Sequence, residues 1–326
     1  MKFSLQGLAT MDVNSGLLQV TEDEHGSRLD RVIMRHVGEE KRPLIQRLIR
    51  QGNVRVNRKR AKPDSRLQRG DEIFLPLSLR QPADEHRADD VIPSGLLRRA
   101  GEIDVLFEDE WLVVVDKPAG MVVHGGSGHG AGMIEALKEL RGLADLRLAH
   151  RLDRDTSGVL LLAKNLEALR KLTEGFRERD MQKTYFALIA GHPYAHAGRM
   201  QSHLAKGVVR GGERMVVDAE GGKEAITDYQ VMFERRADEI DWAMVALTPH
   251  SGRTHQLRVQ LQAEGHPILG DQKYAAKDEQ AAFKAMGGRG LMLHAWRLRF
   301  THPIKKKPME LRASLPANWL KILQNQ

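Results

Sequence analysis

The chain has 326 residues, of which 41% are hydrophobic and 29% charged, a balance typical of globular proteins that excludes extensive disorder. Its net charge is +8, it contains no cysteine, and no apolar stretch approaches the roughly 20 residues of a membrane span. We therefore expect two domains without disulfides, thiolate metal sites or membrane helices. The start lacks the apolar core of a signal peptide, so we expect a cytoplasmic protein.

Two short helices are predicted near the start of the chain. Residues 1–20 show no clear periodicity and are expected to be a tail. Ser27 is placed to cap a helix whose apolar residues recur at four-residue spacing, Leu29, Ile33 and Val37. A second helix is expected to begin at Pro43 and to end at Gly52, residues that favour these two positions.

Most of the positive charge lies between residues 41 and 69. This stretch contains eleven Lys or Arg and one acid, Asp64, for a local charge of +10. A concentrated basic patch indicates a surface that binds a polyanion, whereas ordinary surfaces intersperse both signs. Charge alone does not separate RNA from double-stranded DNA. The cations expected to contact phosphate are Arg47, Arg50, Arg55, Arg58, Lys59, Arg60 and Lys62.

The segment after the second helix predicts a small strand-and-turn unit. Its pattern V-x-V-N, then K-P, then G-D-x-I extends from Val54 to Ile73 and resembles the small RNA-binding domain of ribosomal protein S-four. The resemblance favours RNA as the polyanion. We place this domain at residues 21–81 and a linker, poor in large apolar side chains, at 82–101.

A second domain is expected over residues 102–326. It begins with strand patterns at 103–107 and 111–115, and the glycine-rich run at 124–132 lacks the spacing of a dinucleotide-binding loop. Helices are predicted around residues 134–140 and 166–176. No cofactor motif is present, and the histidines lack the spacing of a zinc site, so neither a cofactor nor a metal ion is expected.

The centre of this domain is the sequence H-R-L-D-R-D-T-S-G at residues 150–158, followed by the apolar strand pattern 159–163. Asp153 lies between Arg151 and Arg154, and nearby positive charge favours an ionised carboxylate that could act as nucleophile or base. The alternative is a capped turn, because Asp, Thr and Ser side chains often bond to neighbouring backbone groups.

Two later segments carry further candidate residues. Tyr185 lies near the start of a predicted strand at 181–189, where it is either a core aromatic or a stacking surface for a base.

Residues 199–247 alternate strand signals with glycines. A helix is predicted from Thr254 to Gly265, and Arg258 within it would by itself be read as a surface arginine.

The H-R-L-D motif, the K-x-Y element ending at Tyr185 and the G-R-T-H-Q-L-R element ending at Arg258 resemble the RluA-type family of pseudouridine synthases. The resemblance implies an α+β fold, with a mainly antiparallel mixed sheet and flanking helices behind the small RNA-binding domain. It also implies that Asp153 is the catalytic residue, that Arg258 pairs with it, that Tyr185 packs against the target uracil, and that Arg151 fills the space of a flipped-out uridine.

Pseudouridine formation breaks the bond from ribose to uracil N1 and rejoins the ring through C5, which needs a carboxylate but no redox cofactor. The residues do not distinguish attack on the sugar, attack on the base and proton removal. The resemblance implies large-subunit ribosomal RNA as substrate, and we expect a monomer. Competing interpretations are a non-catalytic RNA-binding assembly factor, a synthase for another RNA, and a carboxylate-dependent nuclease.

Overall fold

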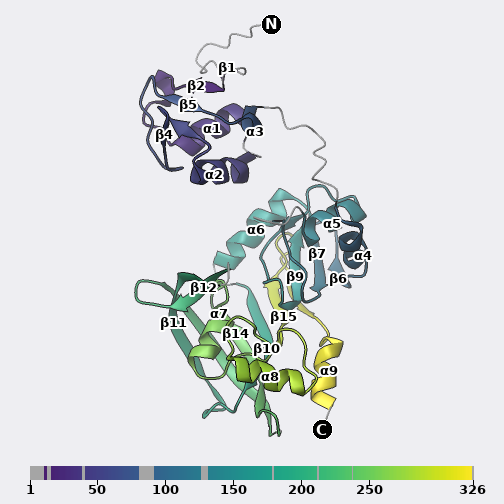
Figure 1. Cartoon of the computed structure of the whole chain (residues 1–326). Coiled ribbons are helices and arrows are strands. Elements are labelled where there is room, and N and C mark those ends of the chain that lie inside the picture. The colour runs from purple at the N-terminus through teal and green to yellow at the C-terminus, as the bar shows by residue number, and fades with distance from the viewer. Residues whose placement is uncertain are drawn as a thin grey trace. The chain divides into compact units, whose positions relative to one another are not determined.

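The computed structural model describes residues 11–12, 16–38, 41–80, 92–125, 131–177, 180–210, 213–236 and 238–324. The chain divides into two compact units, residues 1–88 and 89–326, which are drawn in Figure 1. Most of the predicted tail, residues 82–91 of the predicted linker and residues 126–130 of the glycine-rich run lie outside the described ranges. Within those ranges, no helix is long and apolar enough to cross a membrane.

The first unit is a five-stranded antiparallel sheet packed against two helices. The strand order is β1 (Met11–Asp12), β2 (Leu17–Gln19), β5 (Glu72–Phe74), β3 (Arg55–Val56) and β4 (Lys59–Arg60). The helical segments are η1 (Glu22–Glu24), α1 (Leu29–Val37), α2 (Arg42–Gln51) and α3 (Leu77–Arg80). Leu18 and Ile73 from the sheet pack in one buried cluster with Leu29 and Ile45 from the helices.

Two local predictions for this unit are wrong, and both fail because tertiary contacts replace local ones. Strand β2 lies in the predicted tail, where pairing with β5 makes it part of the sheet. Helix α1 has Arg28, not Ser27, as its N-cap, without a side-chain cap. Its first backbone N–H groups donate instead to the carbonyl oxygens of Ser65 and Pro63, so a distant segment satisfies them.

Helix α2 confirms the second helix prediction. Pro43 stands in its first turn, and Gly52 ends it in the left-handed conformation at φ 80°. The following hairpin of β3 and β4 turns at Asn57 and Arg58, which both have positive φ, as a tight two-residue hairpin requires. The Asn57 amide donates to Asp71 at 2.8 Å, which fixes the turn against the G-D-E-I segment.

The second unit contains an eleven-stranded sheet in which only the β9–β15 pair is parallel among the described pairings. The main strand order is β12, β11, β13, β14, β10, β15, β9, β7 and β6, with β16 beside β15 and β8 beside β9. The strands are β6 (Val105–Glu108), β7 (Leu112–Lys117), β8 (Arg147–Leu148), β9 (Ser157–Ala163), β10 (Gln182–Ala190), β11 (Ala197–Arg210), β12 (Glu213–Asp218), β13 (Lys223–Arg235), β14 (Trp242–Pro249), β15 (Leu293–Thr301) and β16 (Pro308–Arg312).

Helices cover both faces of the sheet around β7 and β9. Helices α4 (Ser94–Gly101) and α5 (Met133–Arg141) lie on one side and α6 (Leu166–Arg177) on the other (Figure 1). Residues of β9 therefore alternate between two buried clusters, and the whole strand is buried, as its continuous apolar pattern predicted. The linker prediction is wrong for residues 94–101, which form helix α4. Ala100 of this helix is buried in the same cluster as residues of α5.

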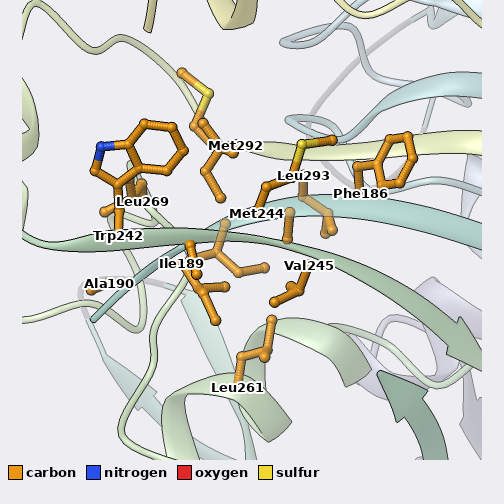
Figure 2. Packing of buried hydrophobic residues seen from close by; sticks show 14 of the residues in the cluster. Phe186, Ile189, Ala190, Trp242, Met244, Val245, Leu261, Leu269, Met292 and Leu293 are labelled. Atoms are coloured by element: carbon orange, nitrogen blue, oxygen red, sulfur yellow. The ribbon is translucent and has the colours of Figure 1, made fainter. Parts of the chain in front are cut away.

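The centre of the sheet carries the largest buried cluster. In Figure 2, Leu261 rises from α7 (Gln256–Ala263) toward Ile189 and Val245, while Trp242 and Met244 point to the opposite side. Helices α8 (Lys277–Ala285) and α9 (Ala317–Gln324) add Phe283 and Trp319 to the same cluster. This packing fixes α7 against β10 and β14, the elements that carry the later sequence motifs.

Gly158 shows why the motif before β9 ends in glycine. Its φ is 110°, and a Cβ at this position would collide with the backbone carbonyl oxygen of Ala295 in β15. Gly158 is the parallel partner of Ala295, next to the pair Ser157 and His294. The glycine therefore permits the close approach of β9 and β15 that positions the motif at the sheet edge.

Candidate active site

A cavity of about 640 Å³ in the second unit is lined mainly by three segments that lie far apart in the sequence. They are the loop before β9, the start of β10, and residues 248–258, which run from the end of β14 into α7. The predicted residues Arg151, Asp153, Tyr185 and Arg258 all line this cavity. The structure thus brings together side chains that were identified in three separate motifs.

A fully buried lysine, Lys117, forms hydrogen bonds to the loop that carries Asp153 and to the turn that follows β7. Its ammonium donates hydrogen bonds to the carbonyl oxygens of Pro118 at 2.9 Å, Met121 at 3.1 Å and Arg154 at 2.9 Å. The backbone N–H of Gly120 donates to the same Arg154 oxygen at 2.9 Å. The turn at residues 117–120 and the loop that carries Asp153 are therefore held together.

The motif contains a backbone turn, whereas its Ser157 hydroxyl contacts a distant side chain and not a neighbouring backbone group. Thr156 N–H donates to the carbonyl oxygen of Asp153 at 3.2 Å, and the Ser157 hydroxyl lies 2.9 Å from His294 Nδ1. Asp155 forms an exposed ion pair with Arg154. Among the described residues that line the cavity, Asp153 is the only carboxylate, and its side chain is 26% exposed.

Arg258 does not form the predicted direct pair with Asp153. Its guanidinium donates two hydrogen bonds of 2.7 Å to Asp271, and both side chains are buried. Burial opposes the charge of Arg258, but Asp271 and then Asp153 raise the pKa of the guanidinium. Arg258 and Asp153 therefore interact through space. The sequence could not reveal Asp271, whose position depends on the fold of the following turn.

Tyr185 lies at a register shift between β10 and β15, between Thr184 and Phe186. Its ring lines the cavity, and burial, followed by the charge of Asp153, raises the pKa of its hydroxyl. The phenol is therefore neutral at ordinary pH. Such a group offers an aromatic face and a hydroxyl to a base, and proton removal by a tyrosinate is disfavoured.

Three residues that line or contact the site were missed in the sequence. His255 lies within the G-R-T-H-Q element, with Nε2 3.9 Å from Oδ2 of Asp153, and its Nδ1 lies 2.7 Å from the hydroxyl of Tyr274. Lys183 precedes Tyr185 by two residues, and burial lowers the pKa of its ammonium. The two-residue strand period could have placed Lys183 beside Tyr185. Nothing local pointed to Tyr274.

The cations predicted to contact phosphate in the first unit are all exposed, on α2 and on the hairpin of β3 and β4 or just beyond it. The contacts that they form go to neutral groups, such as Arg50 to Gln46 and Arg55 to the Gly52 carbonyl oxygen. Within the described part of the chain, none of the seven forms an ion pair with a carboxylate. They are therefore available to an external anion.

Comparison with known proteins identifies the family of each unit. Residues 111–263 match the family model described as RNA pseudouridylate synthase, and residues 27–73 match the S4 domain. The chain is 40% identical over 311 residues to ribosomal large subunit pseudouridine synthase C of Haemophilus influenzae, covering 94% of both proteins. The protein of that name from Escherichia coli is also 40% identical, over 94% of this chain and 95% of its own length.

Solved structures agree with this family assignment. Human RNA Pseudouridylate Synthase Domain Containing 4 matches with a TM-score of 0.56 and 28% identity, covering 70% of this chain and 95% of the other. Human RNA Pseudouridylate Synthase Domain Containing 1 matches at 0.56 and 26%, covering 67% and 85%. The chain belongs to the RNA pseudouridylate synthase family, and it carries an N-terminal S4 domain. The predicted family and α+β fold class are confirmed.

Proposed function

We propose that this chain converts uridine to pseudouridine in large-subunit ribosomal RNA, with Asp153 as the catalytic carboxylate. The observation that carries the proposal is the convergence of three motifs on one cavity in which Asp153 is the only described carboxylate. The substrate is inferred from the names of the relatives, which cover 94% of the chain. We place the enzyme in the cytoplasm, where such RNA is found.

The reaction is an isomerisation that leaves the composition of the nucleoside unchanged. The N1–C1′ bond breaks, the uracil turns and a C5–C1′ bond forms. The hydrogen on C5 leaves as a proton, and N1 gains a proton in its place. Asp153 supplies the carboxylate, Arg258 adds positive charge nearby, and Tyr185 stacks on the uracil. A uridine in paired RNA must leave the stack first, at a cost of a few kcal/mol. The exposed side chain of Arg151 is suited to fill the vacated space.

The cavity is also suited to the backbone that flanks a flipped nucleotide. Arg151, Lys183 and Arg253 line it together with Asp153, so positive charge surrounds the single carboxylate. The exposed cations of the first unit add affinity that does not depend on sequence. We propose a monomer as the working form. Light scattering during size exclusion would check this.

Incubation with large-subunit RNA carrying tritium at uracil C5, without added metal ions, tests the activity. We expect tritium release without strand cleavage. Asp153→Asn is expected to slow release on the order of a thousandfold or more while RNA affinity changes little. Asp155→Asn is the matched control and should retain most activity. Strand cleavage would favour a nuclease, and RNA binding without tritium release would favour an assembly factor.

A further inference from the structure

The ring of His255 stands between Tyr274 and the catalytic carboxylate. Its Nδ1 lies 2.7 Å from the Tyr274 hydroxyl, and its Nε2 lies 3.9 Å from Oδ2 of Asp153. His255 is the N-cap of α7 and has φ 54°, in the left-handed region that non-glycine residues rarely adopt. Such a conformation persists where surrounding contacts fix it. Here they direct the ring into the cavity.

The hydrogen bonds of Tyr274 determine which nitrogen of His255 carries the proton. The hydroxyl of Tyr274 accepts a hydrogen bond from the backbone N–H of Val216 at 3.1 Å. If Nδ1 also donated to this oxygen, the hydroxyl proton would have no acceptor among the described residues. If the hydroxyl donates to Nδ1, each group is satisfied and the ring proton lies on Nε2. Burial raises the pKa of Tyr274 and keeps its hydroxyl protonated.

We propose that His255 is a positioning residue that donates a hydrogen bond from Nε2 to Asp153, and that Tyr274 fixes the tautomer required for it. This inference rests on the proposed function and deepens it. The 3.9 Å separation exceeds a hydrogen bond, but contacts of this kind tighten when the substrate binds. Holding Oδ2 in this way orients the other carboxylate oxygen toward the nucleoside.

One turn positions both neighbours of Asp153. Asp271 pairs with Arg258, and its Oδ1 also accepts the backbone N–H groups of Lys273 at 2.9 Å and Tyr274 at 3.1 Å. The same carboxylate therefore sets the position of Arg258 directly and that of His255 through Tyr274. The turn would therefore affect the reaction through the positions of Arg258 and His255, because its own residues do not line the cavity.

The charges around His255 predict how this contact depends on pH. Burial lowers the pKa of His255, and the charge of Asp153 opposes this effect. The other charged or titratable groups that face the ring are Arg258, Lys273, Asp271 and Tyr274. The ring is therefore neutral at neutral pH. Acid protonates Nδ1, breaks the hydrogen bond from Tyr274 and stabilises the carboxylate of Asp153, so the reaction should slow.

A matched pair of variants separates hydrogen bonding from packing. His255→Gln and His255→Met have similar length and the same backbone strain, but only Gln can donate to Asp153. Under single turnover with saturating full-length protein, His255→Met should slow tritium release about tenfold to a hundredfold, with RNA affinity within about twofold. His255→Gln should recover most of this loss. Equal rates for the two variants would overturn the proposal.

Tyr274→Phe provides a second kinetic test. Loss of the donor to Nδ1 destabilises the neutral ring, so the pKa of His255 should rise and the acidic limb of the rate profile should move to higher pH. A merely structural role for Tyr274 would lower the rate at all pH values without this shift. An unchanged acidic limb would therefore contradict the assigned tautomer.

Nuclear magnetic resonance of RNA-free protein labelled with ¹⁵N-histidine tests the tautomer independently of activity. The His255 signals are those that disappear in His255→Gln. We expect a protonated Nε2 and an unprotonated Nδ1, whereas a proton on Nδ1 would refute the inference. Failure of the unaltered protein to release tritium would instead refute the proposed function, because the tautomer measurement does not depend on it.

Discussion

The two units of the chain use positive charge in opposite ways. In the first unit, cations such as Arg58 and Lys59 are exposed and lack carboxylate partners among the described residues. In the second unit, Lys117 and Arg258 are buried, and each is held by two or three hydrogen bonds. Exposed charge supplies affinity for a polyanion, whereas the hydrogen bonds of these buried basic groups fix the geometry of a reactive group.

Because of this difference, we expect substitutions in the two units to affect different properties of the protein. Loss of a buried cation or its partner should lower both the stability of the protein and the rate of the chemical step. Loss of an exposed cation should weaken RNA binding and leave both other quantities nearly unchanged. Substitutions that changed stability, rate and affinity together in both units would contradict this difference between the units.

The largest loss of stability is expected for Asp271→Asn. It leaves the buried guanidinium of Arg258 without its carboxylate, which typically costs about 3–5 kcal/mol. We expect the free energy of unfolding, measured with urea, to fall by about this amount and tritium release to slow. Asp145→Asn disrupts an exposed ion pair with Arg147 and should change stability by less than about 1 kcal/mol. Similar losses for the two variants would contradict the assigned role of burial.

Lys117→Met should show a smaller effect that depends on pH. Burial, against the charges of Asp155 and Asp153, lowers the pKa of Lys117 from 10.5 to about 7. Between these values the unfolded chain binds more protons than the folded one, so the lysine's contribution to stability rises with pH. The Tm difference between native protein and variant should therefore widen from pH 7 to about pH 9.5.

Lys171→Met, at an exposed position paired with Glu167, is the control for this measurement. Its Tm difference from the native protein should stay constant over the same pH range. A constant difference for Lys117→Met as well would show that burial does not perturb the ammonium. The lost hydrogen bonds should also lower the stability of Lys117→Met by about 1–3 kcal/mol.

The smallest effect on catalysis is expected in the first unit. The double variant Arg58→Gln with Lys59→Gln removes two exposed cations from the hairpin of β3 and β4. The slope of log affinity against log salt should decrease in magnitude by about 1.4–1.8, and the rate at saturating RNA should change less than about twofold. Lys277→Gln with Lys284→Gln, on α8, is the charge-matched control. Equal losses of affinity would show that the hairpin is not a preferred contact.

Local patterns in the sequence determined the elements whose signals lie within a few residues. Pro43 and Gly52 marked both ends of α2, and the apolar run after the H-R-L-D motif marked the fully buried β9. The three motifs also identified the family and the cavity residues, because a motif is a local property. These predictions needed no knowledge of which segments meet.

Which residues become partners depends on the tertiary structure. The N-terminal groups of α1 bond to Ser65 and Pro63 in place of a Ser27 cap, and Ser157 reaches His294 across 137 positions of sequence. Arg258 forms its ion pair with Asp271, and the side chain that lies 3.9 Å from the Asp153 carboxylate is His255. Hydrogen bonds and ion pairs act over a few ångströms, so they depend on the distance between side chains in space, which spacing along the chain does not specify.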